Sequence, residues 1–140
     1  MKIPKSENAL VVRTDFSDQA AWKKICEMIR KPVGLFRFRA NVEFFDDPTM
    51  DSLTASQVLA LLPEQYEHTF IFVVDQDTIR HPEHPVLVVD LYDQPGRVFR
   101  SLPREIQGIE NNLSIANMDF DEFASRVDND GVFRGFPRSM

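Results

Sequence analysis

Two apolar segments without polar alternation constrain the fold of this chain more than any other feature. They are "TFIFVV", residues 69–74, and "VLVV", residues 86–89. A strand with one face in water alternates apolar and polar residues, whereas a strand that is covered on both faces is apolar throughout. We therefore expect these segments to be neighbouring central strands of a sheet that lies between two other layers.

The residues before this central pair predict a strand, a helix and a second strand. "ALVVRT", residues 9–14, has the composition of a short buried strand. Apolar side chains then recur at helical spacing over residues 22–29, and Asp15 or Ser17 is the expected helix cap. Over residues 36–44 apolar and polar side chains alternate, which predicts a strand with one face in water.

Turn and cap residues predict the elements of the C-terminal half. "DQPG", residues 93–96, is a turn signal, so "RVFR" after it is expected to return as an antiparallel partner of the second central strand. Pro103 suits the first turn of a helix. Asp119 and Glu122 have the spacing of a capping box, which predicts the start of a last helix.

The length and composition of the chain suit one folded domain. Of its 140 residues, 43% are apolar and 27% are charged, as in ordinary globular proteins. No repeat, low-complexity tract or linker divides the sequence. We predict a flexible lead at residues 1–8 and a single α/β domain at residues 9–140, with a mixed sheet of four to five strands and about four helices.

The charge and the cysteine content limit the possible partners and compartments. A net charge of −6 and a pI near 5.0 disfavour sequence-independent binding to nucleic acid or to anionic lipid. Cys26 is the only cysteine, so no intrachain disulfide can form. The apolar runs are too short for a signal peptide or a membrane span. We expect a cytoplasmic protein with no nucleic-acid or membrane partner.

Acidic residues follow the predicted strands. Asp75 and Asp77 come after the first central strand, and Asp90 and Asp93 come after the second. In an open α/β sheet, ligands bind outside the carboxyl ends of the strands, and carboxylates that converge there can hold Mg²⁺. Convergence requires the strands to run in the same direction. The earlier strands are also followed by acids, namely Asp15, Asp46 and Asp47.

Two short motifs have both a functional and a structural interpretation. "FVVDQDTI" resembles the opening motif of phosphatases of the haloacid dehalogenase type, but Thr78 follows Asp77 directly, where those enzymes have one residue in between. A solvated turn is the alternative, since Asp tolerates turn geometry. "HPEH", residues 81–84, offers two imidazoles and a carboxylate that suit zinc, or it is a polar connection between strands.

A run of short polar side chains, "ENNLSIANMDF", residues 110–120, is predicted to be a joint between two helices. Asn111 or Asn112 can take the left-handed conformation at a helix end, and Asn117 can satisfy freed backbone groups. The alternative is a binding role for these asparagines, because exposed polar loops often carry function.

Several stretches together resemble a family of small microbial domains of unknown function. The resemblance extends from Leu10 to Phe136 and implies no activity, ligand or functional residue. The stretches that carry it are "LVVRTDFSDQAAW", "LTASQVLALLP", "HPVLVVDL", "PGRVFR", "EIQGIENNLSIANMDFDEFA" and "GVFRGF".

Signatures of several common enzyme classes are absent from the sequence. There is no Gly-x-Ser-x-Gly elbow, and the glycines form neither a Walker loop nor a dinucleotide fingerprint. We therefore expect a non-catalytic module without a cofactor, immunity-type or regulatory, that binds a basic protein partner. The alternative is a Mg-dependent phosphoryl-transfer or hydrolytic enzyme that uses the strand-end acids Asp75, Asp77, Asp90 and Asp93.

Overall fold

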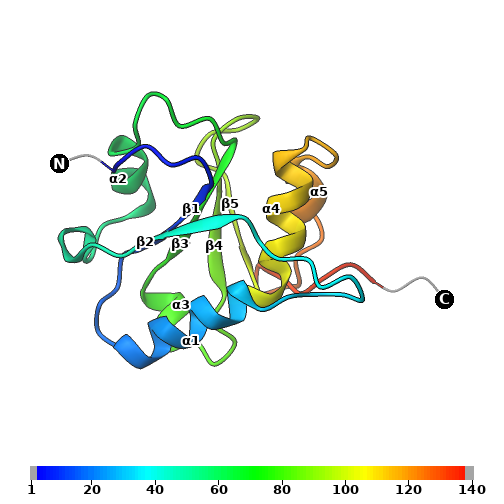
Figure 1. Ribbon diagram of the computed structural model, residues 1–140, viewed down its shortest axis with the longest axis horizontal. Coiled ribbons are helices and arrows are strands. Elements are labelled where there is room, and N and C mark those ends of the chain that lie inside the picture. The colour runs from blue at the N-terminus through cyan, green and yellow to red at the C-terminus, as the bar shows by residue number, and fades with distance from the viewer. Residues whose placement is uncertain (1–2, 138–140) are drawn as a thin grey trace.

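A computed structural model describes residues 3–137, in which one sheet lies between two layers of helices and connecting segments (Figure 1). The strands are β1 (Ala9–Arg13), β2 (Val42–Phe45), β3 (Phe70–Val74), β4 (Val86–Asp90), β5 (Val98–Ser101) and β6 (Val132–Phe133). The α-helices are α1 (Gln19–Arg30), α2 (Ala55–Ala60), α3 (Gln76–Arg80), α4 (Ile106–Ser114) and α5 (Phe120–Ala124). Two 3-10 helices, Pro48–Met50 and Pro103–Glu105, precede α2 and α4.

The sheet is mixed, with the strand order β2-β1-β3-β4-β5-β6. β2, β1 and β3 run parallel, β4 is antiparallel to both of its neighbours, and β6 is parallel to β5. Phe72 of β3 lies opposite Val88 of β4. The two apolar segments are therefore neighbouring central strands, as the sequence predicts, and the returning strand β5 pairs with β4 as expected.

The α/β class with a mixed sheet is confirmed, but the predicted counts are too low. The described residues contain six strands and five α-helices, whereas the sequence predicts four to five strands and about four helices. β6 has only two residues, too few to show a period of two. α3 has five residues and begins at the capping box of Asp75 and Thr78, in a stretch that also fits a turn.

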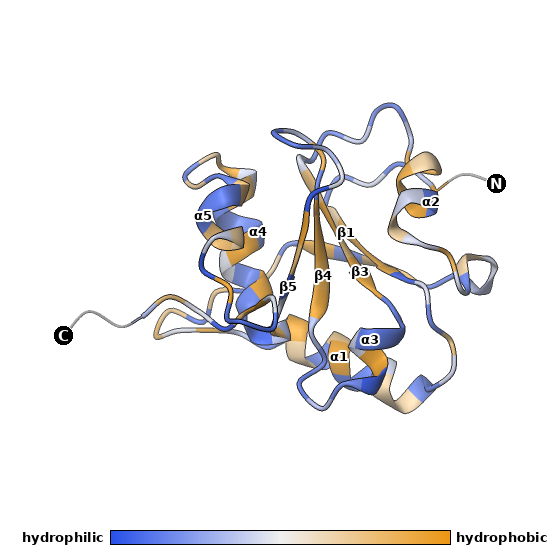
Figure 2. Cartoon of the chain, turned by 180° about the vertical axis from the view of Figure 1, so that it is seen from behind, coloured by the Kyte–Doolittle hydropathy of each residue, from blue (hydrophilic) through white to orange (hydrophobic). Residues whose placement is uncertain are grey.

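Each face of the sheet packs against its own apolar layer. α1, α4 and α5 cover one face, where Trp22, Ile25 and Phe123 belong to a continuous core with side chains of β1, β3 and β4. α2 and the segment before β1 cover the other face, where Val58 and Ile3 pack against the remaining strand side chains. Figure 2 shows the consequence, with apolar strands between helices whose outer sides are polar.

The predicted lead at residues 1–8 and the predicted end at residue 140 are only partly covered, because residues 1–2 and 138–140 lie outside the described residues. Ile3 is 1% exposed, and its N–H donates a 2.9 Å hydrogen bond to the carbonyl of Leu61. Ser6 is also buried, and its hydroxyl donates to the carbonyl of Asn8. Ile3 therefore packs in the layer that contains α2, whereas Pro4, Lys5, Glu7 and Asn8 are exposed.

The cap of α1 differs from the prediction. Asp18 caps the helix by accepting a 3.0 Å hydrogen bond from the N–H of Ala21. Asp15, one of the two expected caps, instead accepts from the N–H of Ser17 and shapes the turn before the helix. The predicted inward face is correct, because Trp22, Ile25, Cys26 and Ile29 are buried.

The predicted strand at residues 36–44 is wrong in its first half. β2 begins at Val42, and before it Val33 and Phe38 form an isolated antiparallel bridge. Gly34 and Arg37 have φ angles of 75° and 55°, which close the chain into a tight turn between them. The sequence does not separate the two structures, because the arms of a hairpin alternate with the same period as a strand.

No helix within residues 3–137 combines the length and the apolar character that crossing a bilayer requires.

Candidate functional site

Strand direction separates the two pairs of central acids. β3 and β4 are antiparallel, and Asp90 at the end of β4 lies opposite Phe70 at the start of β3. Asp75 follows the other end of β3. It therefore lies at one end of the central strands, and Asp90 lies at the other end. The two pairs, Asp75 with Asp77 and Asp90 with Asp93, therefore do not converge on one metal ion.

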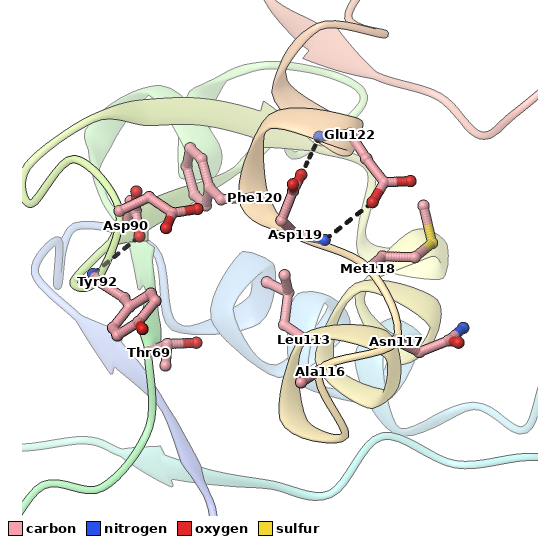
Figure 3. Close-up of a pocket in the computed structure, with 11 residues that line it drawn as sticks. Thr69, Asp90, Tyr92, Leu113, Ala116, Asn117, Met118, Asp119, Phe120 and Glu122 are labelled. Atoms are coloured by element: carbon pink, nitrogen blue, oxygen red, sulfur yellow. Dashed lines mark hydrogen bonds between the residues drawn. The ribbon is translucent and has the colours of Figure 1, made fainter.

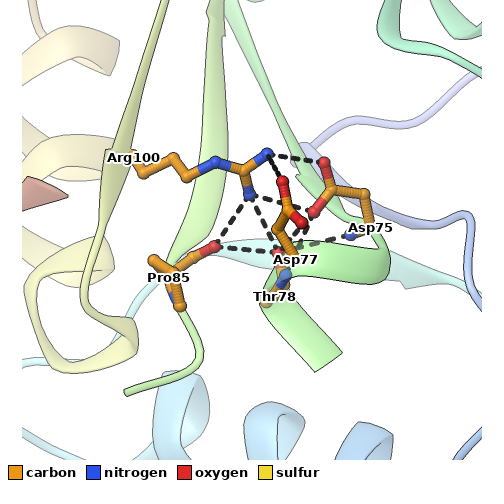
Figure 4. A network of polar contacts seen from close by, with 5 residues as sticks. All are labelled: Asp75, Asp77, Thr78, Pro85 and Arg100. Carbon is orange, nitrogen blue, oxygen red and sulfur yellow. Dashed lines mark hydrogen bonds and ion pairs between the residues drawn. The ribbon is translucent and has the colours of Figure 1, made fainter. Parts of the chain in front are cut away.

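The carboxylate of Asp75 is held by the guanidinium of Arg100, which reaches across from β5 (Figure 4). The two guanidinium nitrogens lie 2.9 and 2.7 Å from the two carboxylate oxygens, a bidentate arrangement. One of these nitrogens also donates to the carbonyl of Pro85 at 3.2 Å, and the other lies 3.4 Å from Asp77. This network ties α3 to β5 and to the start of β4.

The ionisation of this pair follows from its contacts. Burial opposes ionisation of Asp75, but the hydrogen bonds and the positive charge of Arg100, together with hydrogen bonds from Thr78, outweigh burial and lower the pKa of Asp75. Burial also opposes the charge of Arg100, and the contacts with Asp75 outweigh it and raise the pKa of Arg100. Asp75 is therefore an ionised structural partner, and its oxygens are already bonded.

The other acids at the same end of the strands as Asp75 also have local partners. Asp46 is paired with Arg13 at 3.2 Å, and the side chain of Arg13 is only 2% exposed. Asp47 accepts hydrogen bonds from the N–H and the hydroxyl of Thr49. Within residues 3–137, no group of three or more His, Cys, Asp or Glu is arranged to hold a metal ion.

The polar residues of the "HPEH" motif each contact a different partner. His84 is buried, and its Nδ1 lies 2.8 Å from the carbonyl of Thr78. His81 is exposed, and its Nδ1 accepts a hydrogen bond from the N–H of Glu83. The carboxylate of Glu83 pairs with Arg134 at 2.7 Å. These residues form the polar connection between strands that the sequence offers as the second interpretation.

A pocket of about 460 Å³ opens between the turn after β4 and the joint of α4 and α5 (Figure 3). We call it the acidic pocket. Its volume is in the range of ligand-binding clefts. One wall comes from Thr69 and the β4 turn, and the other comes from the end of α4, the joint and the start of α5. The lining residues are Thr69, Asp90, Tyr92, Asp93, Leu113, Ala116, Asn117, Met118, Asp119, Phe120 and Glu122.

The turn that forms the first wall is fixed by Asp90. This side chain is 2% exposed, and its two oxygens accept hydrogen bonds from the N–H groups of Tyr92 and Gln94 at 3.0 and 2.8 Å. The bonds hold Tyr92 at the rim of the pocket, where it is 73% exposed. Asp93 is exposed and makes none of the hydrogen bonds or ion pairs found among residues 3–137, so its carboxylate is open to a ligand.

The second wall is the polar joint that the sequence predicts. Asn112 organises it, because its carbonyl accepts from the N–H groups of Asn117 and Met118 and its side chain donates to the carbonyl of Gly108. The side chain of Asn117 in turn donates to that of Asn112 at 2.8 Å. The left-handed residue is Ala116, with a φ of 55°, and the prediction of Asn111 or Asn112 there is wrong. Asn111 contributes its carbonyl to the N–H of Ile115.

The capping box at the start of α5 is confirmed and places two further acids at the pocket. Asp119 accepts from the N–H of Glu122 at 3.0 Å, and Glu122 accepts from the N–H of Asp119 at 3.2 Å. Each carboxylate keeps oxygen lone pairs beyond the one bonded to the backbone. These bonds fix the orientation of both side chains on the second wall (Figure 3).

The pocket combines negative charge with an apolar wall. Of the described residues that line it, four are acids, Asp90, Asp93, Asp119 and Glu122, and none is basic. Leu113, Met118 and Phe120 supply apolar surface beside them. The arrangement suits a ligand that carries a positive charge next to apolar groups.

Several residues of this pocket are candidate site residues from the sequence alone, but the sequence does not predict that they lie together. Asp90 and Asp93 are candidates as strand-end acids, and Asn117 is a candidate as part of the joint. They meet because β4 runs antiparallel to β3, which turns its carboxyl end toward the joint. Arg13 is not signalled at all, because a single arginine at the end of an apolar strand has no distinctive pattern.

The comparison with protein families gives one match over nearly the whole chain. A family model described as "Domain of unknown function (DUF6924)" matches residues 8–136. The comparison with curated proteins gives no match. The chain belongs to the family of the domain of unknown function DUF6924.

Proposed function

We propose that this protein is a non-catalytic binding module whose acidic pocket receives a basic side chain of a protein partner. The observation that carries the proposal is the combination of four acids with an apolar wall in one pocket. Arginine and lysine have an apolar stem and a cationic head, so one side chain can contact both parts of the lining.

The lining favours a basic side chain over a metal ion. Asp90, Asp119 and Glu122 each accept backbone hydrogen bonds that fix their positions, and Asp93 stands on the opposite wall from the last two. A guanidinium has five N–H donors in a wide fork, and it can bond to carboxylates that are spread over two walls. Mg²⁺ instead requires oxygens in a compact octahedral shell.

The charge of the whole chain supports rapid association with such a partner. The net charge is −6, and a negative surface attracts a basic protein over distances comparable to the Debye length. We propose an immunity-type or regulatory role in the cytoplasm for this module.

The metal-dependent enzyme has weaker support. The central acids lie at opposite ends of the antiparallel strands β3 and β4, and Asp75 is bound to Arg100 in a bidentate pair.

A peptide titration tests the proposal. The probe is a short amidated peptide of alternating arginine and phenylalanine, and its counterpart has glutamate in place of arginine. We expect saturable calorimetric binding of the arginine peptide only, with an affinity that falls as the salt concentration rises. Binding of both peptides, or of neither, contradicts the proposal.

A pair of matched variants locates the binding. Asp93→Asn with Glu122→Gln removes two negative charges from the pocket, while glutamine still suits the capping box. We expect the affinity for the arginine peptide to fall about tenfold or more, since hydrogen bonds to charged groups are worth about 1.5–3 kcal/mol each. Glu27→Gln with Asp51→Asn removes the same charge at exposed positions outside the pocket, and we expect it to leave the affinity nearly unchanged.

A further inference from the structure

A short hairpin projects from the chain between α1 and β2, and we call residues 31–39 the basic hairpin. Val33 and Phe38 close it with two backbone hydrogen bonds, of 2.8 and 2.9 Å. The N–H of Arg37 donates to the carbonyl of Gly34 inside the turn. Arg37 holds a left-handed conformation that is uncommon for a residue other than glycine. The turn is therefore a defined structure with Leu35 and Phe36 at its tip.

The tip is apolar and lies in solvent. Leu35 is 90% exposed, Phe36 is 79% exposed and Phe38 is 57% exposed. The rings of Phe36 and Phe38 contact each other, with centroids 6.0 Å apart, and so form one patch. Single exposed apolar residues are common on protein surfaces, but a contiguous patch on a projecting turn is typical of an interaction site.

The same segment concentrates positive charge in an acidic protein. Residues 31–39 contain no acid, and their three cations are Lys31, Arg37 and Arg39. None of the three takes part in the ion pairs found within residues 3–137. Five other arginines are all ion-paired, namely Arg13, Arg97, Arg100, Arg104 and Arg134.

The basic hairpin and the acidic pocket are complementary in both charge and polarity. The hairpin offers three cations beside three exposed apolar side chains. The pocket offers four acids beside an apolar wall, and Tyr92 at its rim is exposed as well. Each surface therefore supplies what the other lacks.

One copy of the chain does not bring these surfaces together. The hairpin lies near the end of the molecule where α4 begins, and the pocket lies where α4 ends, in both views of the chain (Figures 1 and 2). A contact between them therefore requires two molecules. If the two copies are related by a twofold axis, the contact forms twice and closes the assembly as a dimer.

We propose that the partner of the acidic pocket is a second copy of this chain, whose basic hairpin inserts into it. This inference rests on the proposed function, because it names the occupant of the same pocket. An anionic membrane is the other surface that suits an apolar tip with flanking cations. Two copies of net charge −6 also repel each other, so the choice of a second copy rests on the local match between the cationic, apolar hairpin and the acidic, apolar-walled pocket.

Reciprocal charge reversal tests the proposal. The hairpin variant is Arg37→Glu with Arg39→Glu, and the pocket variant is Asp93→Lys with Glu122→Lys. We expect the native protein to sediment as a dimer at low salt, and each variant alone to sediment as a monomer, because its two surfaces then have the same sign. A mixture of the two variants should sediment as a dimer again, since both contacts become attractive.

Two further variants control for folding and for net charge. Leu35→Ser with Phe36→Ser changes only highly exposed side chains, so it leaves the fold intact, and we expect it to weaken the dimer at least tenfold. Lys23→Glu with Lys24→Glu makes the same charge change as the hairpin variant at exposed positions on α1. We expect this control to dimerise like the native protein at equal salt concentration.

Several outcomes would overturn the inference. They are a native protein that stays monomeric at millimolar concentration, a hairpin variant that still dimerises, or a mixture that stays monomeric. If the native protein is monomeric but binds the arginine peptide at the pocket, only the choice of partner is wrong and the proposed function remains. If a monomeric protein co-sediments with phosphatidylserine vesicles and the hairpin variant does not, the hairpin binds lipid instead.

Discussion

The backbone N–H of Asn41 donates a 2.6 Å hydrogen bond to Oε1 of Glu110, a carboxylate that is 4% exposed on α4. The hydroxyl of Ser114 donates to the other oxygen, Oε2, at 2.7 Å. The bond to Asn41 attaches the segment between the basic hairpin and β2 to the helix whose last turn borders the acidic pocket. Glu110 thus connects the two surfaces that we assign to binding.

This connection predicts a loss of stability when Glu110 is shortened. Glu110→Ala leaves the N–H of Asn41 without its partner, and we expect the free energy of unfolding to fall by about 2 kcal/mol. Glu110→Gln keeps an oxygen at the same position and should lose less. Urea denaturation measures both changes, and a loss below about 0.5 kcal/mol for the alanine variant would show that the bond is not needed.

The ion pair of Arg100 and Asp75 predicts an energetic coupling between α3 and β5. We expect a double-mutant cycle with Arg100→Met and Asp75→Asn to give a coupling of about 1–2 kcal/mol, because both side chains are partly exposed and water screens the pair. Additive losses would indicate that the bidentate geometry contributes no stability.

The same pair predicts how stability depends on pH. The pKa of Asp75 is lowered in the folded state, mainly because contacts with Arg100 outweigh burial. Its contribution is therefore present above the pKa of the unfolded chain and is lost as the pH falls through the folded pKa. Between about pH 5 and pH 2, Asp75→Asn should lose less stability than the native protein. Parallel acid profiles for the two proteins would contradict this assignment.

The thiol of Cys26 is expected to be inert in the folded protein. The side chain is buried on α1, and this burial is the main cause that raises the pKa of Cys26 to about 11. At pH 8 the thiolate is scarce, so a disulfide reagent should react about a hundredfold or more slowly than with the urea-unfolded chain. Equal rates would mean that the face of α1 that carries Cys26 opens readily.

Divalent cations are expected to leave the stability unchanged. The acids at the ends of β3 and β4 are separated, so millimolar Mg²⁺ should leave the melting temperature nearly constant. A converged site would stabilise the fold by about 2.7 kcal/mol at a hundredfold excess over its Kd. A saturable rise in melting temperature that disappears in Asp77→Asn would instead favour the metal-dependent enzyme.

Much of the fold could be predicted because its central strands have an unambiguous pattern. Phe70–Val74 and Val86–Val89 lack a polar face, and this alone indicates that both are central. The capping box of Asp119 and Glu122 is equally local, since both partners lie within one turn. The strand proposed at residues 36–44 failed because a hairpin and a strand share the same alternation, and only the φ angles of Gly34 and Arg37 separate them.

The candidate site could not be assembled from the sequence, because it depends on strand direction. Asp75 follows one central strand in the sequence, and Asp90 and Asp93 follow the next. The antiparallel pairing of β3 and β4 places them at opposite ends of these strands. It also brings Asp90 to the joint that contains Asn117, which lies 27 positions later in the sequence. No local pattern encodes such a contact.

Nitrogen-15 NMR of the hairpin variant, titrated with the arginine-phenylalanine peptide, tests whether the acidic pocket binds a basic side chain. The hairpin variant keeps the pocket free of a second copy, so the peptide is the only cationic ligand. We expect saturable shifts of the amides of Tyr92, Asn117 and Met118, with those of Asp15 and Asp77 unchanged. Shifts confined to Asp15 and Asp77 at the opposite ends of the strands, or no saturable shift at any amide, would contradict binding at the pocket.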